Sequence, residues 1–178
     1  MSEAAFTAAI TGWHDFYLAA AGASAALLGL LFVGVSINLG AIAAKERPDL
    51  RARAGLAFSN LIYVLVVSLV LLIADPEPHG IAIGLGAVAG IALLRPVHSL
   101  YVALGVQHRL RDRLAIVRRV GWTIAADVVI AWVAIVFYAV GDARIVVLLA
   151  AGVLILTIGA ADVAWEMLVQ VSQEHLPG

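Results

Sequence analysis

The sequence predicts an all-α polytopic membrane protein, a bundle of five transmembrane helices that forms a single domain over residues 1–178. Composition is the first observation: 63% of the residues are hydrophobic and 13% are charged, whereas about 25% of a soluble domain is charged. The mean hydropathy of +1.04 is the second. The third is that the apolar residues form long uniform runs, unlike membrane β-strands, which alternate over about ten residues.

Five runs are long enough to cross a hydrocarbon core of roughly 30 Å, which takes about 20 apolar residues in a helix. They cover about residues 16–44, 54–74, 80–104, 120–140 and 145–170. The connections between them are short and polar, and they contain Pro48, Pro76 and Pro78, as expected of helix breakers between spans.

The first run has no basic residues before it and is too long for a secretory signal, so we expect it to be a retained span. Small side chains recur along it at alternating four- and three-residue steps, which places them on one stripe of a helix. Such stripes let membrane helices approach closely, and a helix-packing role is predicted for the stripe and for two later glycines. The predicted packing residues are Gly22, Ala26, Gly29, Gly40, Gly84 and Gly159.

The third run contains an unusual polar group in ALLRPVHSL, residues 92–100. Pro96 has no N–H to give to the carbonyl of Ala92, so a kink is predicted there. The fourth run follows the arginine-rich segment 105–119, and the fifth follows the short connection GDAR, residues 141–144.

The distribution of Lys and Arg predicts the orientation. Nine of them lie in the connections 45–53 and 105–119, whereas the opposite side has only Arg144. The N-terminus is therefore expected outside and the C-terminus inside. The segment 105–119 is expected to contact anionic lipid as an interfacial helix, through Arg109, Arg111, Arg113, Arg118 and Arg119. With a formal net charge of -1, nothing indicates nucleic acid as a partner.

Ionisable residues lie inside the predicted spans, all in the half nearer the basic connections. At about 1.5 Å per residue, Arg95 and Asp162 lie roughly 15 Å from the inner boundary. The full predicted charged site is Arg95, His98, Asp127, Asp162 and Glu166, with a possible polar extension through Ser36, Asn38, Ser59 and Asn60.

Facing lipid, an ionised side chain at this depth costs about 3 kcal/mol or more, so these groups are expected to face the bundle interior and to pair. Arg95 is the one basic partner expected at this level for three carboxyls, so at least one carboxyl should be protonated or reached by water. The same residues also fit a purely structural network, or a site for a ligand or lipid head group.

Other chemistry is mostly absent. The chain has no cysteine, which excludes disulfides and thiolate chemistry. No phosphate-binding glycine loop, no Gly-x-Ser-x-Gly elbow and no HExxH spacing occurs, so we expect neither an enzyme nor a cofactor, and we predict no metal site.

Residues 13–42, WHDFYLAAAGASAALLGLLFVGVSINLGAI, resemble the opening of a widespread group of small bacterial integral membrane proteins. These proteins begin with a Trp-His-Asp-Phe-like motif, continue with Gly-Ala-Ser-Ala-Ala-Leu-x-Gly-Leu-x-Phe-Val and end the span in Ser-x-Asn-Leu. The matching residues here are 13–16, 22–27, Gly29, Leu30, Phe32, Val33, Ser36, Asn38 and Leu39. The rest of the chain is similar only in span layout.

The resemblance implies a multi-pass protein of the bacterial inner (cytoplasmic) membrane. Some members of the group are labelled modulators of the FtsH membrane protease, which implies docking on another membrane protein. That modulator family has seven spans, whereas five are predicted here, and no functional residue is carried over.

The leading hypothesis is a homo-oligomeric membrane protein that forms a pathway for protons or small ions. Arg95 would set the internal potential, Asp162 and Glu166 would titrate or contact the ion, Asp127 would be a fixed counter-charge, and the Pro96 kink would be the point of movement. The alternative is a regulatory or assembly factor that docks on another membrane protein complex. A receptor for a small apolar or anionic ligand near Arg95 is the third hypothesis.

Overall fold

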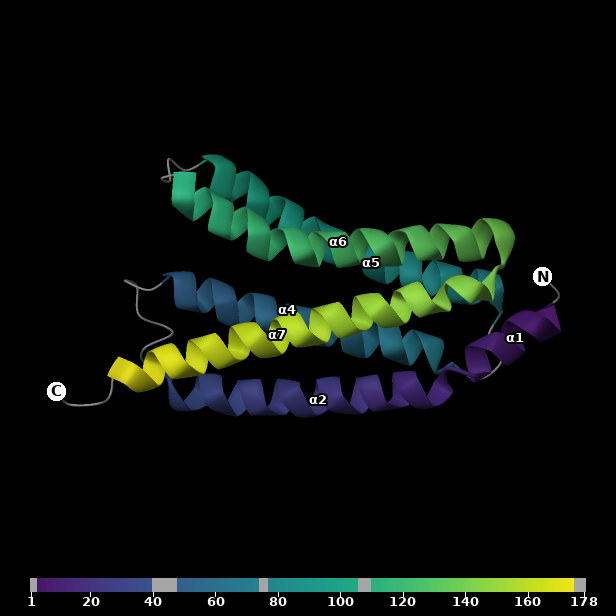
Figure 1. Ribbon diagram of the computed structural model, residues 1–178, viewed down its shortest axis with the longest axis horizontal. Coiled ribbons are helices and arrows are strands. Elements are labelled where there is room, and N and C mark those ends of the chain that lie inside the picture. The colour runs from purple at the N-terminus through teal and green to yellow at the C-terminus, as the bar shows by residue number, and fades with distance from the viewer. Residues whose placement is uncertain (1–2, 40–47, 74–76, 106–109, 175–178) are drawn as a thin grey trace.

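The computed structural model has an all-α fold over the residues that it describes, 3–39, 48–73, 77–105 and 110–174, and it has no strand there (Figure 1). A 3-10 turn, η1 (Ala143–Ile145), precedes the last helix. The α-helices are α1 (Glu3–Thr11), α2 (His14–Ile37), α4 (Pro48–Leu71), α5 (Pro78–Gly105), α6 (Leu110–Val140) and α7 (Val146–Glu174).

The helices fit a helical membrane protein. Among the described residues, three segments are long and apolar enough to cross a membrane, namely His14–Ile37, Arg53–Leu71 and Val146–Glu166. Two shorter apolar stretches lie within α5 and α6, at Pro78–Ala92 and Ile124–Val140. Each of the five apolar runs in the sequence thus corresponds to a long helix.

The helices extend into two of the predicted connections. Helix α4 already begins at Pro48, where the fixed φ of proline suits the first turn of a helix. Helix α6 begins at Leu110 and runs without a break to Val140, so most of the arginine-rich segment belongs to the same helix as the apolar run and is not a separate interfacial helix.

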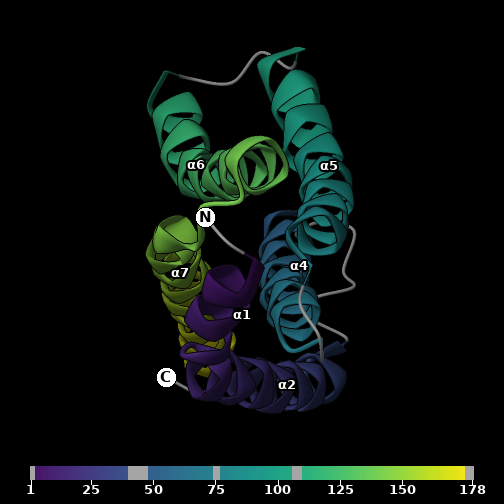
Figure 2. The same ribbon diagram turned by 90° about the vertical axis from the view of Figure 1, so that its right-hand side faces the viewer.

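Helix α4 is central to the bundle and packs against α2, α5 and α7. Seen along the bundle in Figure 2, α5 and α6 form one layer, α4 and α7 the next, and α2 lies on the far side of that second layer. The main core contains residues from every α-helix, among them Val64, Leu85, Phe137 and Leu149, which are fully buried. Helix α2 is therefore peripheral, whereas α4 is surrounded.

The short helix α1 packs against one end of the bundle, an element that the sequence analysis did not predict (Figure 1). Its Phe6 and Ile10 lie one helical turn apart and are both buried in the main core. The ring of Phe6 meets Phe137 of α6 edge-on, with 5.3 Å between the centroids. Nearby, the hydroxyl of Tyr17 donates a 3.3 Å hydrogen bond to the carbonyl of Val146.

Candidate intramembrane polar site

Asp127 is the one acidic residue that the structure buries, within the part of the chain whose side chains it describes. It lies on α6 beside Ala126 and one turn from Ile130, on the face that packs into the core, and only 1% of its surface is exposed. Neither carboxylate oxygen has a hydrogen-bond partner among the described residues. An ionised carboxylate left in this way is costly, so the site requires a proton, a cation or water at these oxygens.

Tyr63 of α4 belongs to the same site, although sequence reasoning missed it. Its side chain is 7% exposed, its hydroxyl also lacks a hydrogen-bond partner in the described structure, and it interacts electrostatically with Asp127. A phenol can donate a hydrogen bond to a carboxylate or accept one from a carboxylic acid. Two complementary groups, one on α4 and one on α6, are thus both buried without a hydrogen-bond partner among the described residues.

Asp162 and Glu166 do not join this site. Both are exposed on α7, on a face that also carries Ile158 and Trp165. The expectation that three carboxyls face one interior layer is therefore wrong for the single chain. The cause is rotation about the helix axis: similar depth along a helix does not place two side chains on the same side of it.

Glu166 has a basic partner that the sequence analysis assigned to a connection. Arg53 Nη1 lies 3.8 Å from Glu166 Oε2, which links α4 to α7. Because α4 begins at Pro48, Arg53 lies within the helix and can reach its neighbour. The signal that could have found this pair is the proline at the first helical position, which moves the start of α4 towards the N-terminus.

Arg95, Pro96 and His98 all lie within α5, which continues through Pro96 to Gly105. Their side chains are outside what the structure describes, so a meeting of Arg95 with the carboxyls stays a prediction, as does the kink. Asn60, from the predicted polar extension, is buried on α4. Ser36, Asn38 and Ser59 donate instead to the backbone carbonyl four residues earlier in their own chain segments, at 2.8, 2.9 and 2.6 Å.

The predicted packing residues separate into two groups. Gly84 lies in an interface, because a Cβ placed there would stand 3.0 Å from Cγ1 of Val70, so α4 and α5 approach closely at this point. Gly22, Gly29 and Gly159 face outward and would meet nothing within 4 Å, and Ala26 is exposed on the same stripe as the first two. Gly40 lies outside the described residues.

The predicted lipid-contacting arginines mostly lie on the first half of α6, namely Arg111, Arg113, Arg118 and Arg119. Arg109 lies outside the described residues, and the side chains of the other four are not described, so lipid contact stays a prediction. Across the residues whose positions are described, no group of three or more His, Asp or Glu side chains is placed to hold a metal ion.

Comparison of the chain with protein-family models, with curated proteins and with solved structures finds no match. The resemblance of residues 13–42 to small bacterial membrane proteins therefore stays a prediction. The function has to be argued from the geometry of the helices and from Asp127 and Tyr63.

Proposed function

We propose that this protein is a homo-oligomeric, five-span protein of the bacterial inner membrane, with its N-terminus outside, that forms a pathway for protons or small ions. The observation that carries the proposal is the Asp127 carboxyl of α6, which is 1% exposed and has no hydrogen-bond partner for either oxygen among the described residues. Acidic groups inside a membrane bundle are expensive and are typical of proton and ion pathways.

Burial supports a central role for Asp127 rather than for Asp162 and Glu166. Glu166 already has a cation at Arg53, and Asp162 lies on the outer surface of the chain. Asp127 and Tyr63 together offer few oxygen ligands, whereas hard cations such as Ca²⁺ take six to eight. A proton needs only one acceptor, so the site favours protons over metal cations.

The homo-oligomer is supported by the outward position of Asp162. Its neighbours on the exposed face of α7 include Ile155, Ile158 and Trp165, so in a lone chain this carboxyl would face lipid. An exposed charge at the centre of a membrane helix costs about 3 kcal/mol or more. A second copy packed at the outward Gly159 would cover the carboxyl and remove that cost.

The pathway is tested with purified protein in liposomes that contain a pH-sensitive dye. We expect the wild-type protein to dissipate an imposed proton gradient, Asp127→Asn to fall to the rate of protein-free liposomes, and Asp127→Glu to retain flux. Asp162→Asn is the matched control and should keep the proton flux, because this carboxyl lies outside the buried site. Wild-type flux in Asp127→Asn, or no flux in the wild type, would end the proposal.

A second function is favoured by the stripe of Gly22, Ala26 and Gly29, which α2 turns away from the rest of the chain. In that case the protein is a regulatory or assembly factor that docks this stripe on another membrane protein complex, for example a membrane protease. A membrane protein that co-purifies at a fixed ratio and is released by Gly29→Leu, but not by Leu30→Ala, would select this function.

A further inference from the structure

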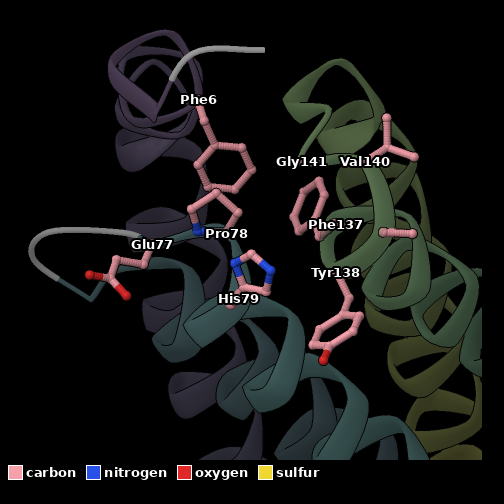
Figure 3. Close-up of a pocket in the computed structure, with 9 residues that line it drawn as sticks. Phe6, Glu77, Pro78, His79, Phe137, Tyr138, Val140 and Gly141 are labelled. Atoms are coloured by element: carbon pink, nitrogen blue, oxygen red, sulfur yellow. The ribbon is translucent and has the colours of Figure 1, made fainter.

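An open cavity of about 430 Å³ lies at the end of the bundle that carries α1 (Figure 3). It lies between α1, the first residues of α5 and the last residues of α6. Figure 3 shows Phe6 and Phe137 along one wall, with His79 and Tyr138 below them. No step of the proposed pathway uses this cavity.

Four of the nine residues that line the cavity are aromatic. Phe6 and Phe137 meet edge-on and are both buried, which fixes one wall. His79 and Tyr138 also meet edge-on, with 5.3 Å between their centroids. Tyr138 is 61% exposed, so part of its ring remains accessible to a ligand. Aromatic ring faces carry negative electrostatic potential and attract cations.

The helix ends around the cavity favour the same sign of charge. The last residues of α6 line it, and the C-terminus of a helix carries partial negative charge. The N–H of Gly141 donates to the carbonyls of Val136 and Phe137. It therefore does not satisfy the carbonyls of the last α6 residues, for which the helix itself has no further N–H donor.

The positive end of α5 does not reverse this sign. Its first residue is Pro78, which has no N–H to offer an anion, and the residue before it is the acidic Glu77, which lines the cavity although its carboxylate points away from the rings in Figure 3. No Lys or Arg is among the lining residues that the structure describes. An anion would therefore find few donors, whereas a cation would meet the exposed ring of Tyr138 and the carbonyls at the end of α6, with the negative charge of Glu77 nearby.

We infer that this cavity binds the ammonium group of an organic cation. A metal ion fits less well, because Glu77 and His79 are the only lining side chains with strong metal-ligand atoms in the described structure. A substituted ammonium is large, weakly hydrated and well matched to aromatic walls. The same group occurs in free amines such as choline and in the head groups of phospholipids such as phosphatidylethanolamine.

The test uses the full-length protein in detergent micelles, with choline as the probe and saturation-transfer NMR of its methyl protons as the readout. The uncharged isostere 3,3-dimethylbutan-1-ol has the same shape without the charge. We expect choline to bind and the isostere to bind more weakly. Tyr138→Leu and Glu77→Gln should each weaken choline binding roughly two- to fivefold, the range for one exposed cation–π contact.

Trp132→Leu is the matched control, because Trp132 is an exposed aromatic residue of the same helix that does not line the cavity. It should leave choline binding unchanged. The inference is overturned if the isostere binds as tightly as choline, if choline does not bind, or if Tyr138→Leu and Glu77→Gln both bind choline like the wild type.

The source of the ammonium group is then separated in lipid nanodiscs. Both kinds of nanodisc contain the same fraction of phosphatidylglycerol, so that their surface charge is equal, and the remainder is either phosphatidylethanolamine or an uncharged glycolipid. If the natural ligand is a lipid head group, choline binding should be weaker in the phosphatidylethanolamine nanodiscs than in the glycolipid nanodiscs. If it is a free amine, choline should bind equally in both. This test does not use the proton-flux assay. A failure to bind choline would therefore leave the proposed pathway unaffected, and an absence of proton flux would leave the proposed binding site unaffected.

Discussion

The long apolar segments of α2 and α4 are equally apolar, yet α2 lies at the edge of the bundle and α4 lies inside it. Their membrane-spanning segments have the same mean hydropathy, but 17% of the α2 segment is buried inside the chain against 50% of the α4 segment. In water such a difference would follow from hydrophobicity, because the more apolar helix would be buried. In lipid, hydrophobicity cannot determine which helix is buried, because acyl chains solvate an apolar face as well as a neighbouring helix does.

Polar and small residues show the same contrast between the inside and the outside of the bundle. Near α4 they are used within the chain: Tyr63 interacts electrostatically with Asp127, and Gly84 lets α5 approach Val70. By contrast, Gly29 on the outward face of α2 and Asp162 on the outward face of α7 are exposed and take part in no such contact in the described structure. The inner set determines the fold and the proposed pathway, and the outer set is available for association.

The largest expected effect compares one leucine from each helix. Leu61 of α4 is 1% exposed and Leu30 of α2 is 68% exposed. Leu61→Ala should lower the free energy of unfolding by about 2–5 kcal/mol because it leaves a cavity. Leu30→Ala should change it by less than about 0.5 kcal/mol. Unfolding by dodecyl sulfate in mixed micelles measures both, and equal losses would contradict the assignment of inner and outer helices.

A glycine pair extends the comparison. Gly84→Leu forces a side chain against Val70 and should cost about 1–3 kcal/mol of folding stability. Gly29→Leu enters open space, so the stability of the isolated chain should not fall. Instead, the oligomer or the partner complex should dissociate, which cross-linking in membranes detects. A Gly29→Leu variant that unfolds like Gly84→Leu would show that α2 packs with the other face inward.

The sequence predicts where each long helix lies along the chain better than it predicts the rotation of that helix about its own axis. Run lengths and prolines locate the long helices, because crossing a membrane requires an unbroken apolar helix. Rotation about each axis is harder to predict, since a helix that is apolar all round has no pattern to show its inner face. For this reason Asp127 and Asp162 were expected together, although only Asp127 faces the core.

Helix ends were the second difficulty. The arginines after residue 108 were assigned to a connection, yet Leu110, Leu114 and Val117 already follow helical spacing and belong to α6. Helix α1 was missed because it is short, and its burial depends on Phe137, a residue far along the chain. No local pattern reports such a tertiary contact.

Hydrogen bonds of two serines give a smaller effect. Ser24 Oγ donates a 2.7 Å bond to the carbonyl of Leu61 and so joins α2 to α4, whereas Ser36 Oγ bonds only within α2. Ser24→Ala should cost about 0.6 kcal/mol, the mean for bonds between membrane helices. Ser36→Ala should be silent in the same unfolding titration. A larger loss for Ser36→Ala would place its hydroxyl in a contact that the single chain does not contain.

The smallest expected effect is at the ion pair between α4 and α7. The 3.8 Å contact between Arg53 and Glu166 is partly exposed, so Arg53→Gln should cost less than about 1 kcal/mol. The loss should shrink when the unfolding titration is repeated at high ionic strength. A loss of several kcal/mol that salt does not alter would show that the pair is buried in the assembled protein.

Water access to Asp127 tests the central claim most directly, and the absence of native cysteine makes the measurement clean. Single cysteines at Asp127→Cys and at the equally buried Ile130→Cys are treated in native membranes with a small water-soluble methanethiosulfonate reagent. The account predicts rapid labelling of the first and little labelling of the second, because a proton pathway must admit water to Asp127. Labelling of Asp127→Cys no faster than that of Ile130→Cys would contradict it.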